Sequence, residues 1–354
     1  MNTALINLGL TPFFSQQLTV EEIEQGELAR VTEVQRSSLV ASDGVDEWTV
    51  TPGSTWYQLP AEQRPTVGDW LLLDKNREKI LRLLDRKSVF QRVAAGSTTE
   101  LQLIAANVDT LFIVTSCNEE FSESRLERYL ALALEAGVDS VVVLTKADLS
   151  DDADAYRERV KAVSPALPVE VVDALNADTL QGLVSWVTKG STVALVGSSG
   201  VGKSTLVNSI SGTEVAETGA IREQDTKGRH TTSYRALHRL PNGGLLLDVP
   251  GMRELKVAQL DTSLAEIFSD IEKFARQCKF RDCEHKDEPG CAVREAIETD
   301  EIDERRLINY QKLIREEARN TASLVERRNQ DKQFGKVIKQ VLELKRIERK
   351  QDGN

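Results

Sequence analysis

The stretch GSSGVGKST, Gly197 to Thr205, decides the fold class of this 354-residue chain. It fits the pattern G-x-x-x-x-G-K-[ST], in which glycines let the backbone wrap a phosphate and the lysine adds a full positive charge. The apolar run TVALV precedes it and a helical pattern follows, which is the strand, loop and helix setting that the motif requires. We therefore predict a phosphate site, with the Ser204 hydroxyl on Mg²⁺, made by Gly197, Ser198, Ser199, Gly200, Val201, Gly202, Lys203, Ser204 and Thr205.

Two switch segments are expected downstream of this loop. The run LLLDVPG places Asp248 at the end of an apolar strand and Gly251 three residues later. In this D-x-x-G arrangement the carboxylate holds magnesium through water, and the glycine amide can bond the γ-phosphate. The polar loop TKGRHTTSY lies between the two motifs, and a hydroxyl of Thr231 or Thr232 is placed to close over magnesium and the γ-phosphate.

A base-reading loop is expected upstream, in the stretch VVVLTKADL, Val141 to Leu149. A carboxylate at Asp148 can accept both the N1–H and the exocyclic amine of guanine, a pairing that adenine does not offer. The second loop, VDALNADTL, supplies a backbone amide for the guanine oxygen. We predict a guanine site formed by Thr145, Lys146, Asp148, Leu149 and Ala174. An ATP-driven factor is the alternative if Asp148 does not read the base.

The order of these motifs is reversed relative to most GTP-binding domains, in which the phosphate loop comes first. This order predicts a circular permutation, the same sheet opened between its second switch and its base loop. From Asn107 onward, strand-like and helical patterns alternate, and the strands are nearly continuous in apolar residues. Such strands are typical of a doubly wound α/β domain whose parallel sheet is covered on both faces.

The flanking regions predict two further domains. Short strand-like runs between Glu27 and Arg92 favour an OB-like β-barrel, a fold that by analogy alone points to RNA. After the α/β region, the run SLAEIFSDIEKFARQ predicts one helix over residues 263–277. The expected organisation is an N-terminal arm (1–25), an OB-fold RNA-binding domain (26–98), a circularly permuted GTPase domain (99–262) and a zinc-binding domain with a basic helical tail (263–354).

A cluster of three thiols and one imidazole lies in the last of these regions: Cys278, Cys283, His285 and Cys291. Three thiolates and one imidazole make the closed tetrahedral set of a structural zinc site, and a closed site has no open position for catalysis. We therefore predict one structural Zn²⁺ per chain. Basic residues around the cluster, Arg294 among them, are expected to meet RNA phosphates.

Composition limits the class of protein and its partners. The net charge is −11, but residues 305–354 hold 14 Lys or Arg and 7 Asp or Glu, a net charge of +7, so the rest carries −18. This asymmetry favours an anionic partner for the tail, with a solvated charged helix as the alternative. No apolar run approaches the roughly 20 residues that span a bilayer, and we expect a cytoplasmic protein with no membrane partner.

Taken together, these motifs are similar to those of one known family. The segments GSSGVGKST, TKGRHTT, DVPGMRE, IAANVDTLFIV and RLERYL, with the Cys and His cluster, resemble the RsgA (YjeQ) family of circularly permuted GTPases that act in maturation of the small ribosomal subunit. The resemblance implies an OB-fold domain, a permuted GTPase and a zinc domain. It also implies hydrolysis of GTP to GDP and phosphate, stimulated by the small (30S) subunit, with that subunit and its 16S rRNA as partners. The chain departs from the family's more frequent Asn, Ser and Thr at Thr145, Asp173 and Val249.

The resemblance also suggests how hydrolysis is done. Ras-like enzymes orient the attacking water with a Gln just after D-x-x-G, and here Met252 occupies that position. The isolated domain is therefore expected to be slow. The resemblance suggests His230 as the water-positioning residue once the ribosome orders its loop, although His230 could instead touch rRNA. An rRNA-binding assembly scaffold, in which GTP only modulates affinity, is the alternative function, and a monomer is the default state.

Overall fold

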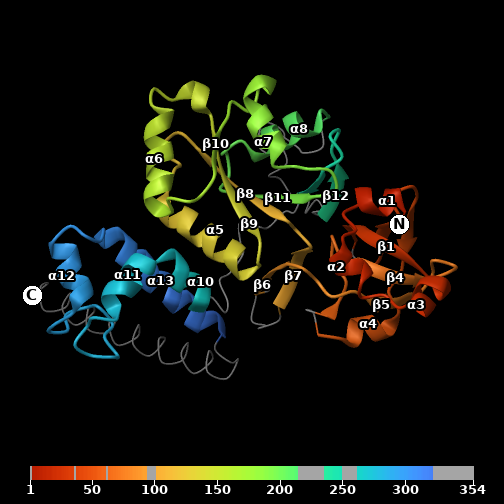
Figure 1. Ribbon diagram of the computed structural model, residues 1–354, viewed down its shortest axis with the longest axis horizontal. Helices are drawn as coiled ribbons and strands as arrows, with labels where there is room; N and C mark the ends of the chain where they lie inside the picture. The colour runs from red at the N-terminus through yellow and green to blue at the C-terminus, as the bar shows by residue number, and fades with distance from the viewer. Residues whose placement is uncertain are drawn as a thin grey trace, which may run out of the picture.

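The computed structural model describes residues 2–35, 37–60, 63–93, 101–213, 235–248 and 261–321. Figure 1 shows an α/β region at the centre, a β-barrel on one side of it and a group of helices on the other. Four predicted site residues, His230, Thr231, Thr232 and Gly251, lie outside the described residues, as does the tail beyond residue 321.

The central sheet confirms the predicted α/β class. Its strands are β8 (Thr110–Ser116), β9 (Asp139–Thr145), β10 (Val169–Val171), β11 (Thr192–Val196) and β13 (Leu245–Asp248). They lie in the order β10-β9-β8-β11-β13 and every neighbouring pair is parallel. β12 (Arg235–Arg239) continues the sheet as an antiparallel neighbour of β13. Parallel strands joined through helices place all their carboxyl ends at one edge of the sheet, where ligand loops gather.

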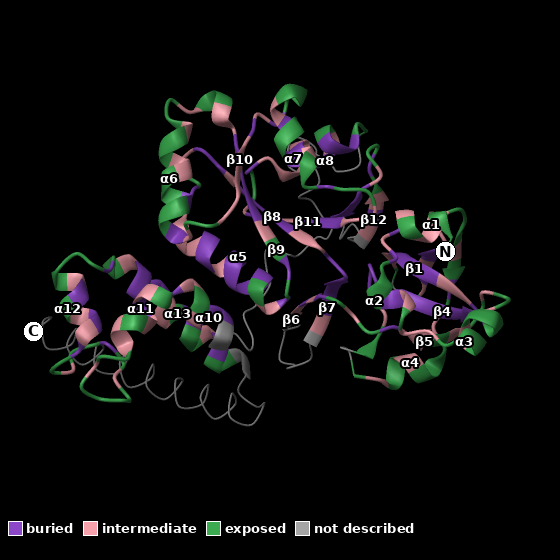
Figure 2. Cartoon of the chain, viewed as in Figure 1, coloured by how far each residue is buried: buried purple, intermediate pink, exposed green. Residues whose placement is uncertain are grey.

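Helices cover both faces of this sheet. Leu111 and Ile113 of β8 belong to the core shared with α5 (Glu123–Glu135) and α6 (Ala153–Val163). The alternate residues of the same strand, Phe112 and Val114, belong to the core shared with α7 (Gln181–Ser185) and α8 (Lys203–Ser211). Figure 2 shows the buried strands running between these two layers. A strand buried on both faces explains why the sequence of β8 is continuously apolar.

Five strands form the predicted OB-like barrel: β1 (Gly26–Val34), β2 (Leu39–Ser42), β3 (Glu47–Val50), β4 (Trp70–Asp74) and β5 (Ile80–Leu83). They pair in the order β3-β2-β1-β4-β5, all antiparallel. The long strand β1 therefore carries both halves of the barrel, whose interior holds Ala29, Val31, Leu71 and Leu73. A short helix, α4 (Ser54–Gln58), lies between β3 and β4.

The segment predicted as an arm folds into three short helices, α1 (Thr3–Asn7), α2 (Pro12–Ser15) and α3 (Val20–Gln25). Leu8 and Phe14 are buried, and the Phe14 ring lies 5.7 Å from that of Trp70 in β4. The buried Arg30 donates to the backbone carbonyls of Leu8, Gly68 and Asn107. These contacts hold residues 2–25 against the barrel.

The barrel and the α/β domain share one continuous sheet. Strand β1 pairs with β12, so that Glu33 stands opposite Ala236 and Val34 opposite Arg235. The hairpin of β6 (Val89–Val93) and β7 (Leu101–Ala106) also spans the predicted boundary between residues 98 and 99. The domain boundaries predicted from the sequence stay predictions.

The C-terminal region is helical, with α10 (Asp261–Ile267), α11 (Ser269–Ala275), α12 (Ala292–Glu298) and α13 (Glu304–Thr321). The single helix expected over residues 263–277 is wrong, because the chain breaks at Phe268, whose φ is −103° and ψ 35°. Phe268 is fully buried and its ring packs 5.3 Å from that of Tyr310 in α13, which accounts for the break. Within the described residues, helices long and apolar enough to cross a membrane are absent.

Candidate functional site

The phosphate loop joins the carboxyl end of β11 to the start of α8. Gly200 and Gly202 have φ of 77° and 89°, in the left-handed region that favours glycine. At Gly197 a Cβ atom would lie only 2.2 Å from the carbonyl oxygen of Val114 in the neighbouring strand β8. The three glycines are therefore needed for the shape of the loop.

Lys203 lies inside this loop. Its ammonium donates to the carbonyl oxygen of Gly197 at 2.8 Å and also to that of Ser198. The helix behind it is anchored by Leu206 and Ile210, which are buried on the sheet. This arrangement fixes a positive charge and the amino end of α8 at the same edge of the sheet, where an anionic phosphate is stabilised.

The base loop contacts the phosphate loop directly. Thr145, at the end of β9, is fully buried, and its hydroxyl lies 2.6 Å from the carbonyl oxygen of Val201 and 3.2 Å from that of Thr115. Lys146 follows with φ of 58°, and Asp148 stands exposed in the turn Ala147–Leu149. The Thr145 side chain, shorter than the family's Asn, therefore still joins the two loops.

The second base loop is tied to the helix that follows the phosphate loop. Ser209 of α8 donates to the carbonyl oxygen of Ala174 at 2.6 Å. Asp173 shapes the turn, because its carboxylate accepts from the amide of Leu175 at 2.9 Å. Leu175 is 83% exposed next to Ala174, as Leu149 is 76% exposed next to Asp148. Two exposed leucines beside a predicted base site offer apolar cover for a ring, and Leu175 was missed from the sequence.

Predicted residues from both sides of the permutation thus meet at one edge of the sheet. Thr145 and Ala174 come from the upstream loops, and Val201 comes from the phosphate loop. Ser209, which was not predicted, joins Ala174 to the helix after that loop. Asp248 ends β13, the strand next to β11, so its backbone lies at the same edge. The roles assigned to individual residues of this site stay predictions.

Arg125 is a further residue of this edge that sequence reasoning missed. It lies in the first turn of α5, whose amino end is capped by the Ser122 hydroxyl. Its Nη1 donates to the Ser198 hydroxyl in the phosphate loop at 2.9 Å. A basic residue soon after a strand adjacent to the phosphate-loop strand is the signal that could have found it.

The Cys and His cluster comes together in the loop between α11 and α12. The four ligand atoms, from Cys278, Cys283, His285 and Cys291, lie within 4.8 Å of one another. His285 Nδ1 is 3.6 Å from the sulfur of Cys278 and 3.5 Å from that of Cys291, and those two sulfurs are 4.0 Å apart. Metal–sulfur bonds of about 2.3 Å and metal–nitrogen bonds of about 2.0 Å give tetrahedral edges of about 3.5 to 3.8 Å. The residues therefore fit a tetrahedral metal ion.

The surroundings of the cluster act on its imidazole and on the loop that carries it. Burial lowers the pKa of the His285 imidazole below its usual value, which favours the neutral form that binds a metal. Arg294 donates to the carbonyl oxygens of His285 and Lys286, both at 3.0 Å, and contacts Glu304 at 3.1 Å. Arg294, expected to meet RNA, is thus engaged in holding the metal loop.

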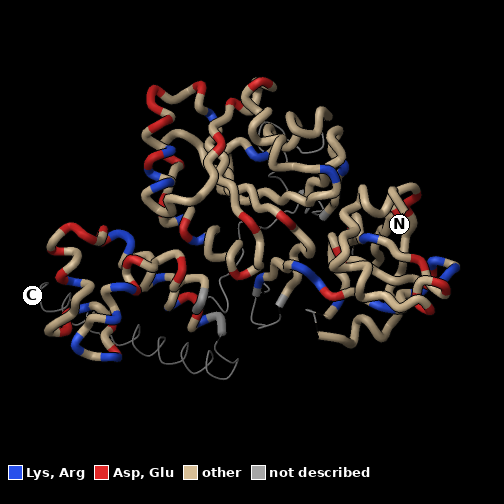
Figure 3. Tube along the Cα trace, in the orientation of Figure 1, with Lys and Arg blue, Asp and Glu red and all other residues tan. Residues whose placement is uncertain are grey.

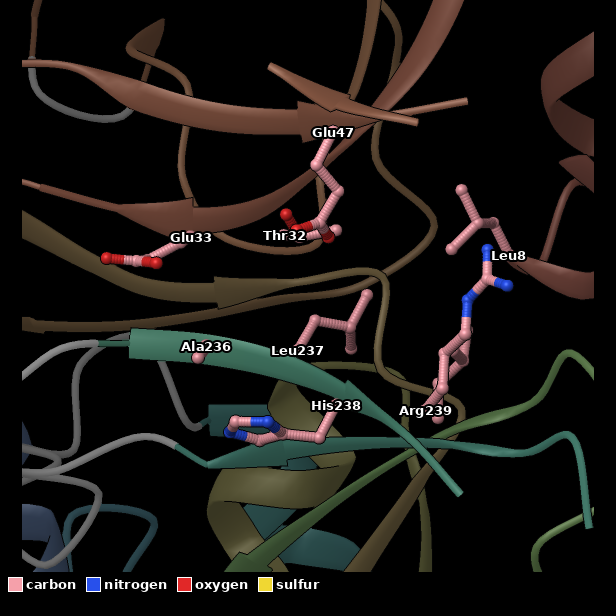
Figure 4. Close-up of a pocket in the computed structure, with 9 residues that line it drawn as sticks. Leu8, Thr32, Glu33, Glu47, Ala236, Leu237, His238 and Arg239 are labelled. Carbon is pink, nitrogen blue, oxygen red and sulfur yellow. The ribbon is translucent and has the colours of Figure 1, made fainter. Parts of the chain in front are cut away.

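A cavity with a volume of about 290 Å³ lies elsewhere, between the barrel and β12 (Figure 4). Its lining includes Thr32 and Glu47 from the barrel, and Leu237 and Arg239 from β12. Figure 4 shows the Arg239 side chain extending toward Leu8. The lining contains none of the predicted nucleotide residues, so the cavity belongs to the interface between the barrel and the α/β domain.

Comparison with known proteins finds GTPases that match most of the chain. The model of the RsgA GTPase family matches residues 83–258, and a model described as a 50S ribosome-binding GTPase matches residues 192–350. The second match begins at β11, the strand before the phosphate loop. A small ribosomal subunit biogenesis GTPase RsgA 2 of Vibrio parahaemolyticus is 48% identical over 342 residues, covering 97% of this chain and 94% of that protein. A small ribosomal subunit biogenesis GTPase RsgA of Mesorhizobium japonicum is 43% identical, covering 90% and 91%.

Solved structures agree on the fold. The crystal structure of YjeQ from Thermotoga maritima superposes with a TM-score of 0.59 at 25% identity, covering 81% of this chain and 97% of that one. YloQ, described as a circularly permuted GTPase, gives a TM-score of 0.53 at 22% identity over 86% and 96%. With 48% identity over nearly its whole length, and with its base loops placed before its phosphate loop around one sheet, the chain belongs to the RsgA family of circularly permuted GTPases, enzymes that hydrolyse GTP.

Proposed function

We propose that this GTPase binds the small (30S) ribosomal subunit and hydrolyses GTP to GDP and phosphate during late maturation of that subunit, with turnover stimulated by the subunit. The observation that carries this proposal is the 48% identity, over 97% of the chain, to a protein named a small ribosomal subunit biogenesis GTPase. The hydrogen bond from the Thr145 hydroxyl to the carbonyl oxygen of Val201 supports it, because this bond joins the loop proposed to read the base to the loop proposed to hold the phosphates.

The nucleotide is assigned to the residues at the carboxyl edge of the sheet. Lys203 and the loop amides hold the phosphates, and Asp148 selects guanine. Ser204 and Asp248 hold Mg²⁺, which supplies charge neutralisation between the β- and γ-phosphates. The switch residues Thr231, Thr232 and Gly251 close on the γ-phosphate, and His230 positions the attacking water.

We assign Zn²⁺ to the Cys and His cluster. Four protein ligands complete a tetrahedron, so the ion has no open position and serves the fold of the C-terminal region. The loop between Cys278 and Cys291 has little apolar sequence of its own, and the cluster with the Arg294 bonds supplies its order.

The 16S rRNA of the small subunit is the expected contact of the barrel and of the basic tail. A cytoplasmic place of action and a monomeric state go with this partner. One match, described as a 50S ribosome-binding GTPase, names the other subunit. The relatives that cover nearly the whole chain name the small subunit, and we give them the greater weight.

Steady-state turnover of GTP tests this function, measured alone, with purified small subunits, with purified large subunits and with ATP in place of GTP. We expect at least tenfold acceleration by small subunits only, and no turnover of ATP. The variant Lys203→Ala should abolish the accelerated rate, which excludes a contaminating enzyme. Equal rates with and without small subunits, combined with GTP-dependent binding to them, would favour the assembly scaffold, and acceleration by large subunits would replace the proposed partner.

A further inference from the structure

Arg125 brings a second positive charge to the phosphate loop. Strands β8 and β11 are parallel neighbours, so the start of α5, which follows β8, lies beside the loop that follows β11. Arg125 Nη1 donates to the Ser198 hydroxyl at 2.9 Å, while the carbonyl oxygen of the same residue accepts from Lys203. Two cations from different elements therefore converge on Ser198.

The guanidinium of Arg125 has nitrogens that can donate to a ligand. Its other contacts are the carbonyl oxygen of Glu120 at 3.1 Å and the carboxylate of Glu120 at 3.9 Å. Within the described part of the chain, all three contacts use Nη1, which leaves the other guanidinium nitrogens for an anion. The Glu120 side chain is 55% exposed, and an ion pair so exposed contributes little. A phosphate can therefore compete for Arg125.

Contacts with α13, on the opposite side of helix α5, fix the helix that carries Arg125. Residues two apart on a helix point about 200° from each other, so Glu127 faces away from the phosphate loop. The Glu127 carboxylate is fully buried and accepts from Arg305 and Arg306 of α13, both at 3.0 Å. Asn309 of α13 also donates to it at 2.5 Å and to the carbonyl oxygen of Ser124 at 3.3 Å. The backbone that carries Arg125 is thus fixed before any nucleotide arrives.

We propose that Arg125 is a phosphate ligand supplied by the chain itself, whose guanidinium contacts the γ-phosphate of bound GTP. This inference rests on the proposed GTP site. A preorganised cation beside the transferring phosphoryl group stabilises the charge on its oxygens during attack by water and departure of GDP. The guanidinium moves no proton in this step. GDP lacks the γ-phosphate, so the contact favours GTP over GDP.

Nucleotide binding without ribosomes tests this role. We compare Arg125→Gln, Arg125→Lys and the wild-type chain by measuring Kd for a non-hydrolysable GTP analogue and for GDP. A charged hydrogen bond is worth about 1.5 to 3 kcal/mol, which is about 10- to 150-fold in affinity. We expect Arg125→Gln to lose affinity for the GTP analogue by about that factor and to keep its affinity for GDP within about threefold. Single-turnover hydrolysis at saturating GTP should fall by at least tenfold, and Arg125→Lys should recover part of both losses.

Two control variants separate this role from a structural one. Arg159→Gln removes an arginine that contacts the same helix at Glu123, at 2.8 Å, and lies on α6. It should change neither affinity. Glu120→Gln removes the carboxylate that lies 3.9 Å from Arg125 and leaves the cation, so the preference for GTP should remain. Equal losses of GTP and GDP affinity in Arg125→Gln, no recovery in folded Arg125→Lys, or a Glu120→Gln variant that behaves like Arg125→Gln would each overturn the proposal.

The test of Arg125 can be distinguished from the test of the proposed ribosomal function. Absence of acceleration by small subunits in the wild-type chain removes the proposed function while the nucleotide preference set by Arg125 stands. Normal acceleration together with an unchanged GTP preference in Arg125→Gln removes this inference alone.

Discussion

The α/β domain is joined to its two neighbours by different kinds of contact. On the barrel side the contacts go to the backbone: β1 pairs with β12, and the side chains of Arg30 and Arg239 donate to the main-chain carbonyl oxygens of Asn107 and Gly44. On the C-terminal side the joint is made of side chains, with Glu127 of α5 bound to three polar residues of α13 and Arg128 bound to Glu316 at 2.5 Å. Figure 3 shows both signs of charge mixed over these C-terminal helices.

This difference has consequences for how each joint can be changed. Backbone pairing tolerates many side chains, so the barrel joint depends on few individual residues. The C-terminal joint depends more strongly on one side chain, because Glu127 is the fully buried carboxylate that both arginines share, whereas their other partners, Asp270 and Asp303, are exposed. The C-terminal joint is therefore the one that single substitutions, metal removal and pH should open.

Removal of the metal should have the largest effect. A structural zinc contributes about 10 to 16 kcal/mol in small domains, so a chelator or Cys283→Ser should unfold the loop between α11 and α12 and loosen α13. Limited proteolysis should then cut the C-terminal region and leave the barrel and the α/β domain intact. GTP binding should persist, since the nucleotide loops do not include the cluster.

The matched control for this experiment is Cys117→Ala, which changes a buried cysteine of the α/β domain. It should leave the metal content at one zinc per chain. Substantially less than one zinc in the untreated protein, or full resistance of the chelated protein to protease, would contradict the assignment.

Substitution of Glu127 should have the next largest effect. Glu127→Gln leaves Arg305 and Arg306 without their buried charge, and breaking a buried ion pair costs about 3 to 5 kcal/mol. Urea unfolding should show this loss. Glu123→Gln, on the same helix with the partly exposed partner Arg159, should cost less than about 1 kcal/mol. Similar losses in the two variants would show that the buried joint has no special role.

Many individual elements of this architecture can be predicted from local sequence, whereas the contacts that join the domains cannot. The phosphate loop, β8 and the end of α5 at Gly137, with φ of 67°, were predictable because glycine conformation and apolar periodicity act over a few residues. The same holds for the spacing of the metal ligands. The switch residues predicted from their motifs stay predictions.

Contacts between distant segments left no local signal. The pairing of β1 with β12 joins residues about two hundred positions apart, and strand pattern alone does not name a partner. Arg125 and Glu127 carry no such signal either, because nothing in their spacing shows which face of the helix meets α13 or the phosphate loop. The break at Phe268 was missed since packing against Tyr310 overrides a continuous helical pattern.

Substitution of Arg30 tests how much side chains contribute to stability on the barrel side. Burial lowers the pKa of its guanidinium to about 10, so it stays charged at neutral pH while binding three carbonyl oxygens. Arg30→Met should remove the side-chain donor from all three oxygens, of which that of Gly68 keeps the Asn107 amide, and cost about 2 to 4 kcal/mol of unfolding free energy. The control, Arg92→Met on β6, removes an arginine bonded to Gln102 in the neighbouring strand and should cost less than about 1 kcal/mol. A loss in Arg30→Met as small as in this control would mean that strand pairing alone holds the barrel.

The smallest expected effect is a dependence of the C-terminal joint on pH. Burial, and then the charge of Glu317 in α13, raise the pKa of Glu135 from 4.5 to about 7. The folded chain therefore binds a proton at Glu135 as the pH falls through 7, whereas the unfolded chain binds it only near 4.5. It follows that the contribution of this group to stability is full below about pH 4.5 and is lost as the pH rises through 7.

Glu135→Gln should remove this dependence. The variant should be more stable than the wild-type chain at pH 8, by about 1 to 2 kcal/mol after allowance for the partial exposure of the side chain, and the difference should vanish below about pH 4.5. Thermal unfolding of both proteins across this range measures it, with Glu158→Gln, an exposed carboxylate paired with Lys161, as the control. A wild-type stability that rises between pH 6 and pH 8 relative to Glu135→Gln has the opposite sign and would place the Glu135 carboxylate in a favourable ionic contact. The ionised form of Glu135 would then stabilise the contact between α5 and α13. A rise in pH would not weaken this contact, so that pH dependence would no longer distinguish it from the contact on the barrel side.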